Sequence, residues 1–99
     1  MNGGVGGRNQ QFALACAERI KNEQMCVLSA GTDGVDGNSS AAGAVVDGTT
    51  VERATQAGFD TRKVLERFDA YPLFLAIGDA IEIGPTGNNL RDLRIVLAS

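Results

Sequence analysis

The 99-residue sequence contains no histidine and no tryptophan, and it has only two cysteines, four phenylalanines and one tyrosine. Without histidine, the chain cannot form a Ser-His-Asp or Cys-His catalytic arrangement of its own. A zinc site is also disfavoured, because Cys16 and Cys26 are too far apart in the sequence to form a C-x-x-C pair. We expect both thiols to be reduced and packed, and the core to be mostly aliphatic.

The sequence also has no excess of basic residues. The nine Lys and Arg residues are scattered among twelve Asp and Glu residues, which gives a net charge of −3. This argues against a nucleic-acid partner, whose binding surface would carry clustered positive charge. No apolar run approaches the roughly 18 residues that span a bilayer, and the first residues do not resemble a signal peptide. The sequence therefore predicts no membrane partner and a cytoplasmic location.

The length predicts a single domain that covers residues 1–99. A chain of this size buries about 64% of its unfolded surface, which is enough for one modest core but not for two lobes that close over a substrate. Residues 1–7 include four glycines, and we expect them to be a flexible start that holds no conformation alone.

Apolar patterns predict helices and short strands along the rest of the chain. A helix with one apolar face begins at Asn9, and residues 25–30 form an apolar run without alternation, as expected of a strand buried on both faces. Polar caps followed by apolar positions predict further helices over 41–46, from about 50 to 57, over 62–68 and over 69–76. Two more strands are predicted over 80–83 and 93–97.

This order of elements predicts an α/β fold, with a small mixed or parallel sheet and helices packed against it. Three strands are few for an isolated sheet. We therefore expect that a further strand belongs on the N-terminal side of Gly3.

Two polar, glycine-bracketed loops follow predicted strands, one over 29–37 and the other over 84–90. Loops of this kind at strand ends are common ligand sites in α/β folds. In the first loop, Asp33 and Asp36 are candidates to hold Mg²⁺ through its waters, or to accept a hydrogen bond from a substrate hydroxyl. In the second loop, Thr86 and the amides after Gly87 are suited to a carboxylate or a phosphate. Asx turns in the first loop and a plain strand connection in the second are the structural alternatives.

A third polar feature is the motif Gly-Gly-Arg-Asn-Gln at 6–10, which leads into the first predicted helix. Backbone amides at the start of a helix favour an anion, and the guanidinium of Arg8 adds a two-pronged donor. The motif lacks the Gly-Lys-Ser/Thr ending of a P-loop and the preceding strand of a dinucleotide fingerprint. The alternative is a frayed glycine tail followed by a surface arginine.

The order of these motifs is more informative than any one of them. Gly-Gly-Arg-Asn-Gln at 6–10 is followed by Ser-Ala-Gly-Thr-Asp-Gly-Val-Asp-Gly at 29–37, by Asp-Ala-Tyr at 69–71 and by Gly-Pro-Thr-Gly-Asn-Asn at 84–89. This order resembles the C-terminal (MOFRL) domain of glycerate 2-kinases, a family also labelled hydroxypyruvate reductases of tartrate degradation. The resemblance covers nearly the whole chain. The reductase label has little support in the residues, because the sequence has no strand–Gly-x-Gly-x-x-Gly–helix unit.

The resemblance implies a much longer, two-domain enzyme that transfers the γ-phosphoryl group of ATP, with Mg²⁺, to the 2-hydroxyl of D-glycerate. Its active site would lie in the cleft between a larger N-terminal domain and this one, so this chain alone would not be catalytic. The expected partners are D-glycerate or a related small hydroxy acid, together with the missing N-terminal kinase domain. ATP and Mg²⁺ belong to the parent enzyme, and neither is expected on this chain alone.

Carried over residue by residue, the resemblance implies that Arg8 and Asp33 are the catalytic candidates, with Asp33 and Asp36 as candidates for Mg²⁺. The residues implied to bind substrate or phosphate are Gly7, Asn9, Gly31, Thr32, Asp36, Thr86 and Asn89.

Three residues depart from the family pattern. The family usually has Asn-Asp-Ser-Tyr where this chain has Phe68, Asp69, Ala70 and Tyr71, and it prefers threonine at Asn88. Phe68 and Ala70 remove two hydrogen-bonding side chains from a region that the resemblance places near the cleft. The alternative function is therefore a stand-alone module that binds a small acid or phosphate, or that forms a homo-oligomer through an exposed sheet edge.

Overall fold

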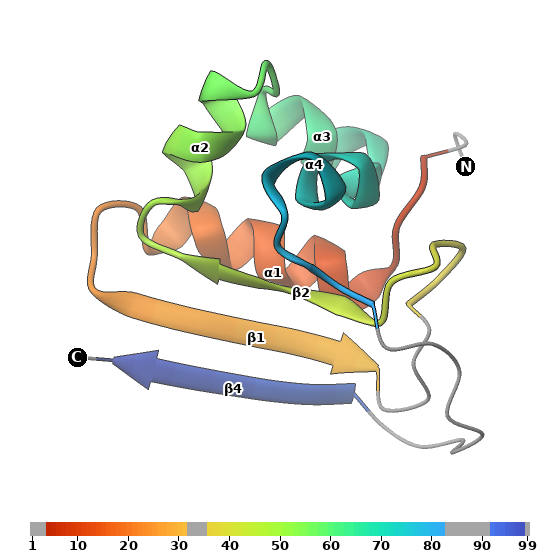
Figure 1. Cartoon of the computed structure of the whole chain (residues 1–99), viewed down its shortest axis with the longest axis horizontal. Coiled ribbons are helices and arrows are strands. Elements are labelled where there is room, and N and C mark those ends of the chain that lie inside the picture. The colour runs from red at the N-terminus through yellow and green to blue at the C-terminus, as the bar shows by residue number, and fades with distance from the viewer. Residues whose placement is uncertain (1–3, 32–35, 83–91, 99) are drawn as a thin grey trace.

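The computed structural model describes residues 4–31, 36–82 and 92–98, and in these residues four helices lie on one side of a four-stranded sheet (Figure 1). α1 lies directly against the sheet, and the other three helices pack against α1 and against one another. In chain order the elements are α1 (Arg8–Arg19), β1 (Met25–Gly31), β2 (Gly43–Asp47), α2 (Thr50–Gln56), α3 (Thr61–Arg67), α4 (Ala70–Ile77), β3 (Ala80–Ile81) and β4 (Asp92–Ala98).

The strands follow the order β3-β2-β1-β4, and each of the three neighbouring pairs is antiparallel. The prediction of an α/β fold with helices packed on a small sheet is confirmed. The predicted parallel or mixed pairing is wrong for the described strands. The strand that pairs with both β1 and β3 is β2, which lies where a helix was predicted, and both of its pairings are antiparallel.

That helix was predicted over 41–46, where the structure has β2 instead. Val46 is buried and Val45 is half-buried, which is the alternation of a strand with one covered face. β-branched valines also favour a strand over a helix. Gly43 permits the pairing, because a Cβ on it would lie 1.9 Å from the backbone oxygen of Ser29. Close approach to β1 therefore outweighs the helix-forming tendency of the neighbouring alanines.

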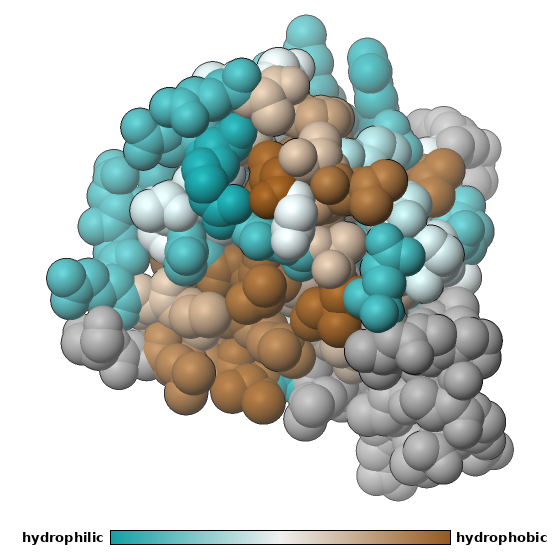
Figure 2. Space-filling view, in the orientation of Figure 1, coloured by the Kyte–Doolittle hydropathy of each residue, from teal (hydrophilic) through white to brown (hydrophobic). Residues whose placement is uncertain are grey.

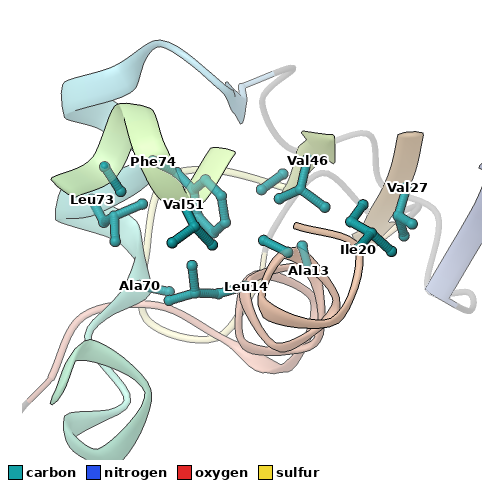
Figure 3. Close-up of a cluster of buried hydrophobic side chains, with 12 residues drawn as sticks. Ala13, Leu14, Ile20, Val27, Val46, Val51, Ala70, Leu73 and Phe74 are labelled. Atoms are coloured by element: carbon teal, nitrogen blue, oxygen red, sulfur yellow. The ribbon is translucent and has the colours of Figure 1, made fainter. Parts of the chain in front are cut away.

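The core lies between α1, the sheet and the outer helices (Figure 3). Leu14 of α1, Leu73 and Phe74 of α4 are fully buried, and Val27 and Val46 meet them from the sheet. Burying a side chain of this size contributes about 2 kcal/mol of hydrophobic free energy. The core is aliphatic apart from Phe74 and the half-buried Phe12 and Phe59 at its margin, as the composition predicts.

Residues close in the sequence determine where α3 and α4 begin. The side chain of Asp60 accepts hydrogen bonds from the backbone N–H groups of Arg62 and Lys63, and so caps α3 as its position predicts. Pro72 lies in the first turn of α4, where it costs no helical hydrogen bond. None of the helices in the described part of the chain has the length and apolar character needed to cross a bilayer.

One face of the sheet is covered by α1, and no described helix lies on the other (Figure 1). The prediction that residues 25–30 are buried on both faces is therefore wrong for the described structure, in which Cys26 and Leu28 are half-buried. Cys16 and Cys26 both carry free thiols, as predicted.

Candidate functional site

The two glycine-bracketed loops leave the sheet at the same end. β1 ends at Gly31, which pairs with Asp92 at the start of β4, and Gly43 at the start of β2 pairs with Ile81 at the end of β3. The start of α1 lies at this end as well (Figure 1). The candidates Thr32, Asp33, Thr86 and Asn89 lie outside the described residues. The structure thus brings the described flanks of both loops together with Arg8.

Asp36 lies at the start of α1 and caps it from a distant part of the chain. Its Oδ1 accepts hydrogen bonds from the backbone N–H and the side-chain Nδ2 of Asn9, at 2.9 and 3.3 Å. Its Oδ2 accepts from the backbone N–H and the side-chain Nε2 of Gln10, at 2.8 and 3.1 Å. The carboxylate is 2% exposed. The anion that the helix start was expected to bind is therefore the protein's own side chain, and Asp36 is a structural residue.

Asn9 is also buried, and it links α1 to the sheet. Its Oδ1 accepts a hydrogen bond of 2.6 Å from the hydroxyl of Ser29 in β1. Nε of Arg94 in β4 donates to the same hydroxyl at 3.3 Å, and the guanidinium of Arg94 lies 4.1 Å from the ring centroid of Phe12. Asn9 thus supports the site from within rather than facing a ligand, and Gly31 likewise donates its N–H to the backbone of Ala42 at 2.8 Å.

Neighbouring loops fix the glycine-rich segment from Gly4 onward. Asn38 accepts a hydrogen bond from the N–H of Gly6 at 2.8 Å and donates its Nδ2 to the carbonyl of Gly4 at 3.0 Å. On the other side, the N–H of Val5 donates to Oδ1 of Asp69 at 2.7 Å. A Cβ on Gly7 would lie 2.4 Å from the backbone of Asp36. The segment that was expected to hold no conformation alone obtains one from these contacts, and its glycines allow the close approach.

Arg8 lies at a pocket of about 480 Å³ beside this segment. Its exposed side chain brings a planar cation to a pocket whose accessible walls are otherwise mostly apolar, and half of the lining residues are glycines. A guanidinium is a two-pronged donor suited to a carboxylate or a phosphate. The lining residues are Gly4, Gly6, Gly7, Arg8, Gln11, Gly37, Asn38 and Phe68.

Of the lining residues, the sequence identified Gly7 and Arg8 as site candidates and placed Phe68 near the cleft, but it missed Gln11 and Asn38. Phe68 is 55% exposed and has φ 53°, a left-handed conformation that asparagine adopts more easily than an aromatic residue. It follows the last turn of α3, where the backbone must reverse before α4 begins. Phenylalanine at this position therefore has a local conformational cost.

A smaller polar group lies where β3 ends. The hydroxyls of Ser40 and Tyr71 are 2.9 Å apart, and both reach the carboxylate of Glu82, at 3.0 and 3.3 Å respectively. Tyr71 is half-buried. Its hydroxyl ties α4 to the point where the second loop begins.

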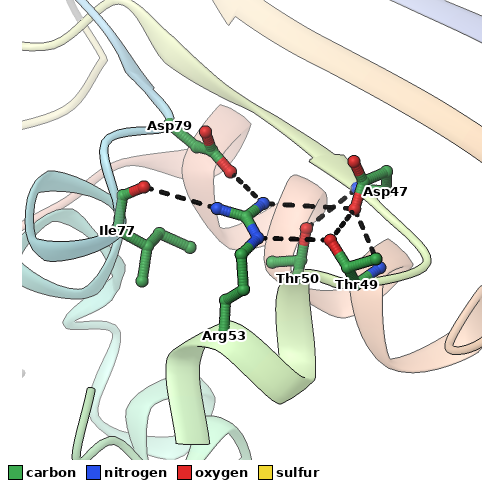
Figure 4. A network of polar contacts seen from close by, with 6 residues as sticks. All are labelled: Asp47, Thr49, Thr50, Arg53, Ile77 and Asp79. Carbon is green, nitrogen blue, oxygen red and sulfur yellow. Dashed lines mark hydrogen bonds and ion pairs between the residues drawn. The ribbon is translucent and has the colours of Figure 1, made fainter. Parts of the chain in front are cut away.

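The other marked polar cluster surrounds Arg53 and is structural (Figure 4). Nη2 of Arg53 lies 2.6 Å from Oδ2 of Asp79, and Nε donates to the hydroxyl of Thr49 at 3.2 Å. Asp47 lies at the margin of the cluster, 4.0 Å from Nη2. Hydrogen bonds from the hydroxyl and N–H of Thr49 lower the pKa of Asp47 below its ordinary value of 3.8. The cluster joins α2 to both β2 and the connection before β3.

Magnesium was expected at Asp33 and Asp36, of which only Asp36 belongs to the described residues. Within residues 4–31, 36–82 and 92–98 no group of three acidic, cysteine or histidine side chains is placed to hold a metal. Both carboxylate oxygens of Asp36, a candidate for Mg²⁺, accept hydrogen bonds from Asn9 and Gln10 at the start of α1.

Comparison with known proteins gives a consistent result. Residues 1–92 match the model of the MOFRL family. The chain is 36% identical over 97 residues to "Glycerate 2-kinase" of Pyrococcus horikoshii, and 42% identical over 95 residues to "D-glycerate 2-kinase" of Thermotoga maritima. These alignments cover 98% and 95% of this chain, but 22% and 23% of the relatives.

The fold agrees with a solved structure. The crystal structure of glycerate kinase from Thermotoga maritima superposes on the whole of this chain with a TM-score of 0.94 and 40% identity, and the match covers 24% of that protein. This chain therefore spans less than a quarter of the length of these relatives. The matched residues, and the fold that they adopt, show that the chain belongs to the MOFRL family.

Proposed function

We propose that this chain is the C-terminal domain of an ATP-dependent D-glycerate 2-kinase and forms one wall of an interdomain active-site cleft. The observation that carries the proposal is the exposed Arg8 at a glycine-lined pocket, at the end of the sheet where both polar loops depart. The relatives named glycerate 2-kinase support it, since they align with nearly all of this chain.

Arg8 would bind the carboxylate of D-glycerate or a phosphoryl oxygen. Phosphoryl transfer depends mainly on positioning and on stabilising negative charge, and a guanidinium does both through paired N–H donors. Gly7 and the backbone around the pocket would let the substrate approach closely. Asp36 and Asn9 would act indirectly, by holding the start of α1 so that Arg8 keeps its place.

The remaining chemistry would come from elsewhere in the enzyme. Mg²⁺ bound with ATP would neutralise charge on the transferred group, and Asp33 is the residue of this chain that we propose for contact with it. The larger domain would bring ATP and the other essential groups, including a lysine. The isolated chain would then be inactive, because half of the cleft is missing.

Arg8 can be tested in a full-length hybrid enzyme, in which this chain replaces the matching C-terminal residues of the Thermotoga maritima D-glycerate 2-kinase. We expect Arg8→Ala to lower kcat/KM for D-glycerate by about 10- to 100-fold, the equivalent of losing a charge-assisted hydrogen bond pair. Arg62→Ala is the matched control, because Arg62 is 84% exposed and is not among the residues that line the pocket. Equal kinetics for the two variants would contradict the assignment of Arg8.

A second candidate is a non-catalytic module that binds a small acid or forms a homo-oligomer. The observation that favours it is the edge strand β4, on which Val96 and Leu97 are 57% and 63% exposed. Unpaired edge strands with apolar side chains invite pairing with another strand. Two measurements on the isolated chain test this candidate: sedimentation over a range of concentrations, and thermal melting with D-glycerate or phosphate added. A chain that stays monomeric at every concentration, and whose Tm neither ligand raises, would exclude it.

A further inference from the structure

The sheet face opposite α1 carries a set of apolar side chains that we call the open-face band. The register places Leu97 opposite Cys26, and Ile95 opposite Leu28. Opposite residues share a face and successive residues alternate, so this set points away from Val27 and the core. Figure 2 shows hydrophobic side chains gathered over β1 and β4. The open-face band consists of Cys26, Leu28, Val45, Ile95 and Leu97.

The part of the band that lies on β4 is the most exposed. Ile95 is 41% exposed and Leu97 is 63% exposed. At one end of the band, Cys26, Asp47 and Leu97 contribute to a hollow of about 400 Å³. Contiguous exposed apolar side chains beside a hollow are typical of a contact surface.

The sequence of β1 gives independent support. Residues 25–30 do not alternate between apolar and polar, a pattern typical of strands covered on both faces. The described helices cover only one face. The apolar run in β1 is accounted for if a surface outside the described residues covers the second face.

The relatives indicate what that cover is. In the solved Thermotoga maritima protein, the same fold is about a quarter of one continuous chain, because the match covers all of this chain and 24% of that one. We propose that the open-face band is the docking surface for apolar residues of the larger N-terminal part of a glycerate 2-kinase polypeptide. This inference rests on the proposed function, and it assigns the band to the interface between the two parts rather than to ligand binding.

The test compares two aspartate substitutions, Leu97→Asp in the band and Leu75→Asp on α4. Leu75 is 54% exposed and belongs to the helical layer, so it matches Leu97 in exposure but not in location. Both substitutions are made in the isolated chain and in the hybrid enzyme defined above. Thermal melting is measured for each, and the rate of maleimide labelling of Cys26 is measured in a Cys16→Ser background.

We expect both substitutions to change the melting of the isolated chain little and equally. In the hybrid, Leu97→Asp should lower Tm by several degrees while Leu75→Asp should not, because only Leu97 would be buried there. Cys26 should be labelled at least about tenfold more slowly in the hybrid than in the isolated chain, since labelling would require the interface to open.

Equal labelling of Cys26 in both proteins, or equal effects of the two substitutions in the hybrid, would overturn the inference. An isolated chain that dimerises until Leu97→Asp is introduced would also overturn it, by making a second copy the occupant. Kinase activity is a separate readout. A hybrid in which Cys26 is protected but which has no activity would contradict the proposed function and leave the docking surface in place. An active hybrid in which Cys26 is freely labelled would support the proposed function and contradict the docking surface.

Discussion

Asp36 caps the helix α1 by accepting a hydrogen bond of 2.8 Å from the backbone N–H of Gln10, a residue 26 positions earlier in the chain. The same carboxylate accepts three further hydrogen bonds from Asn9 and Gln10 while 2% exposed. A buried anion at a helix start is stabilised by the aligned N–H groups and the helix dipole. This contact fixes the first loop against α1 and so places Arg8 at its pocket.

Replacing Asp36 by alanine is expected to lower the free energy of unfolding by about 3 kcal/mol, because it leaves buried N–H groups without acceptors. Asp60→Ala is the control, since Asp60 caps α3 from an exposed position and its loss should cost about 1 kcal/mol. Urea denaturation followed by circular dichroism measures both. Equal losses would show that the Asp36 contact is no stronger than an ordinary surface cap.

A substitution at Phe68 is expected to stabilise the fold. Because it adopts φ 53°, Phe68→Asn should raise the free energy of unfolding by about 1 kcal/mol through relief of the left-handed conformation. Leu75→Asn is a suitable comparison, because Leu75 is about as exposed but lies within a helix, where asparagine is unfavourable by about 0.5 kcal/mol. A lower stability for Phe68→Asn would mean that the contacts of the phenyl ring outweigh the backbone cost.

The Arg53 cluster should contribute measurably to stability. Arg53 is held at 2.6 Å from Asp79 and also donates to the carbonyl of Ile77, so Arg53→Ala should cost about 1–2 kcal/mol. Arg62→Ala should cost almost nothing, since Arg62 is 84% exposed and only approaches Glu18 at 3.9 Å. Chemical denaturation of both variants distinguishes a clamp between elements from a solvated ion pair, and indistinguishable midpoints would refute the clamp.

Asp47 makes part of the stability depend on pH. Thr49 holds the pKa of Asp47 below 3.8 in the folded chain, so the unfolded chain takes up the proton first as the pH falls. The contribution is therefore complete above about pH 3.8 and is lost as the pH falls through the folded pKa. Wild type should exceed Asp47→Asn in stability at pH 7 by less than about 1 kcal/mol, because the side chain is half-exposed.

Denaturation of both proteins at pH 7 and at about pH 3 tests this. We expect the difference between them to shrink toward zero at the lower pH. A difference that stays constant would mean that the Thr49 hydrogen bonds do not depend on the charge of Asp47.

The parts of the fold that depend on local signals could be predicted. Asp60 identifies the start of α3 because its cap contacts lie within three residues, and Pro72 is compatible with the first turn of α4. β2 could not be identified in this way, because its conformation depends on Gly43 approaching Ser29 on another strand. The missed strand is the one that pairs antiparallel with both β1 and β3.

Some residues of the candidate site could be predicted from the sequence, and others could not. Arg8 and Gly7 were found because glycine, arginine and a helix start are neighbours in the sequence. The structural role of Asp36 could not be found, because its partners lie in a distant segment, and Asn38 was missed for the same reason. The roles of Asp33, Thr32, Thr86 and Asn89 stay predictions, since these residues lie outside the described part of the chain.

The most direct test of the account is ADP release with D-glycerate, ATP and Mg²⁺, measured for the isolated chain and for the hybrid enzyme under the same conditions. The account predicts turnover by the hybrid, a marked loss on Arg8→Ala, and none by the isolated chain. Turnover by the isolated chain would contradict the claim that it is one wall of a cleft. A folded hybrid without turnover would contradict the claim that this wall belongs to a glycerate kinase.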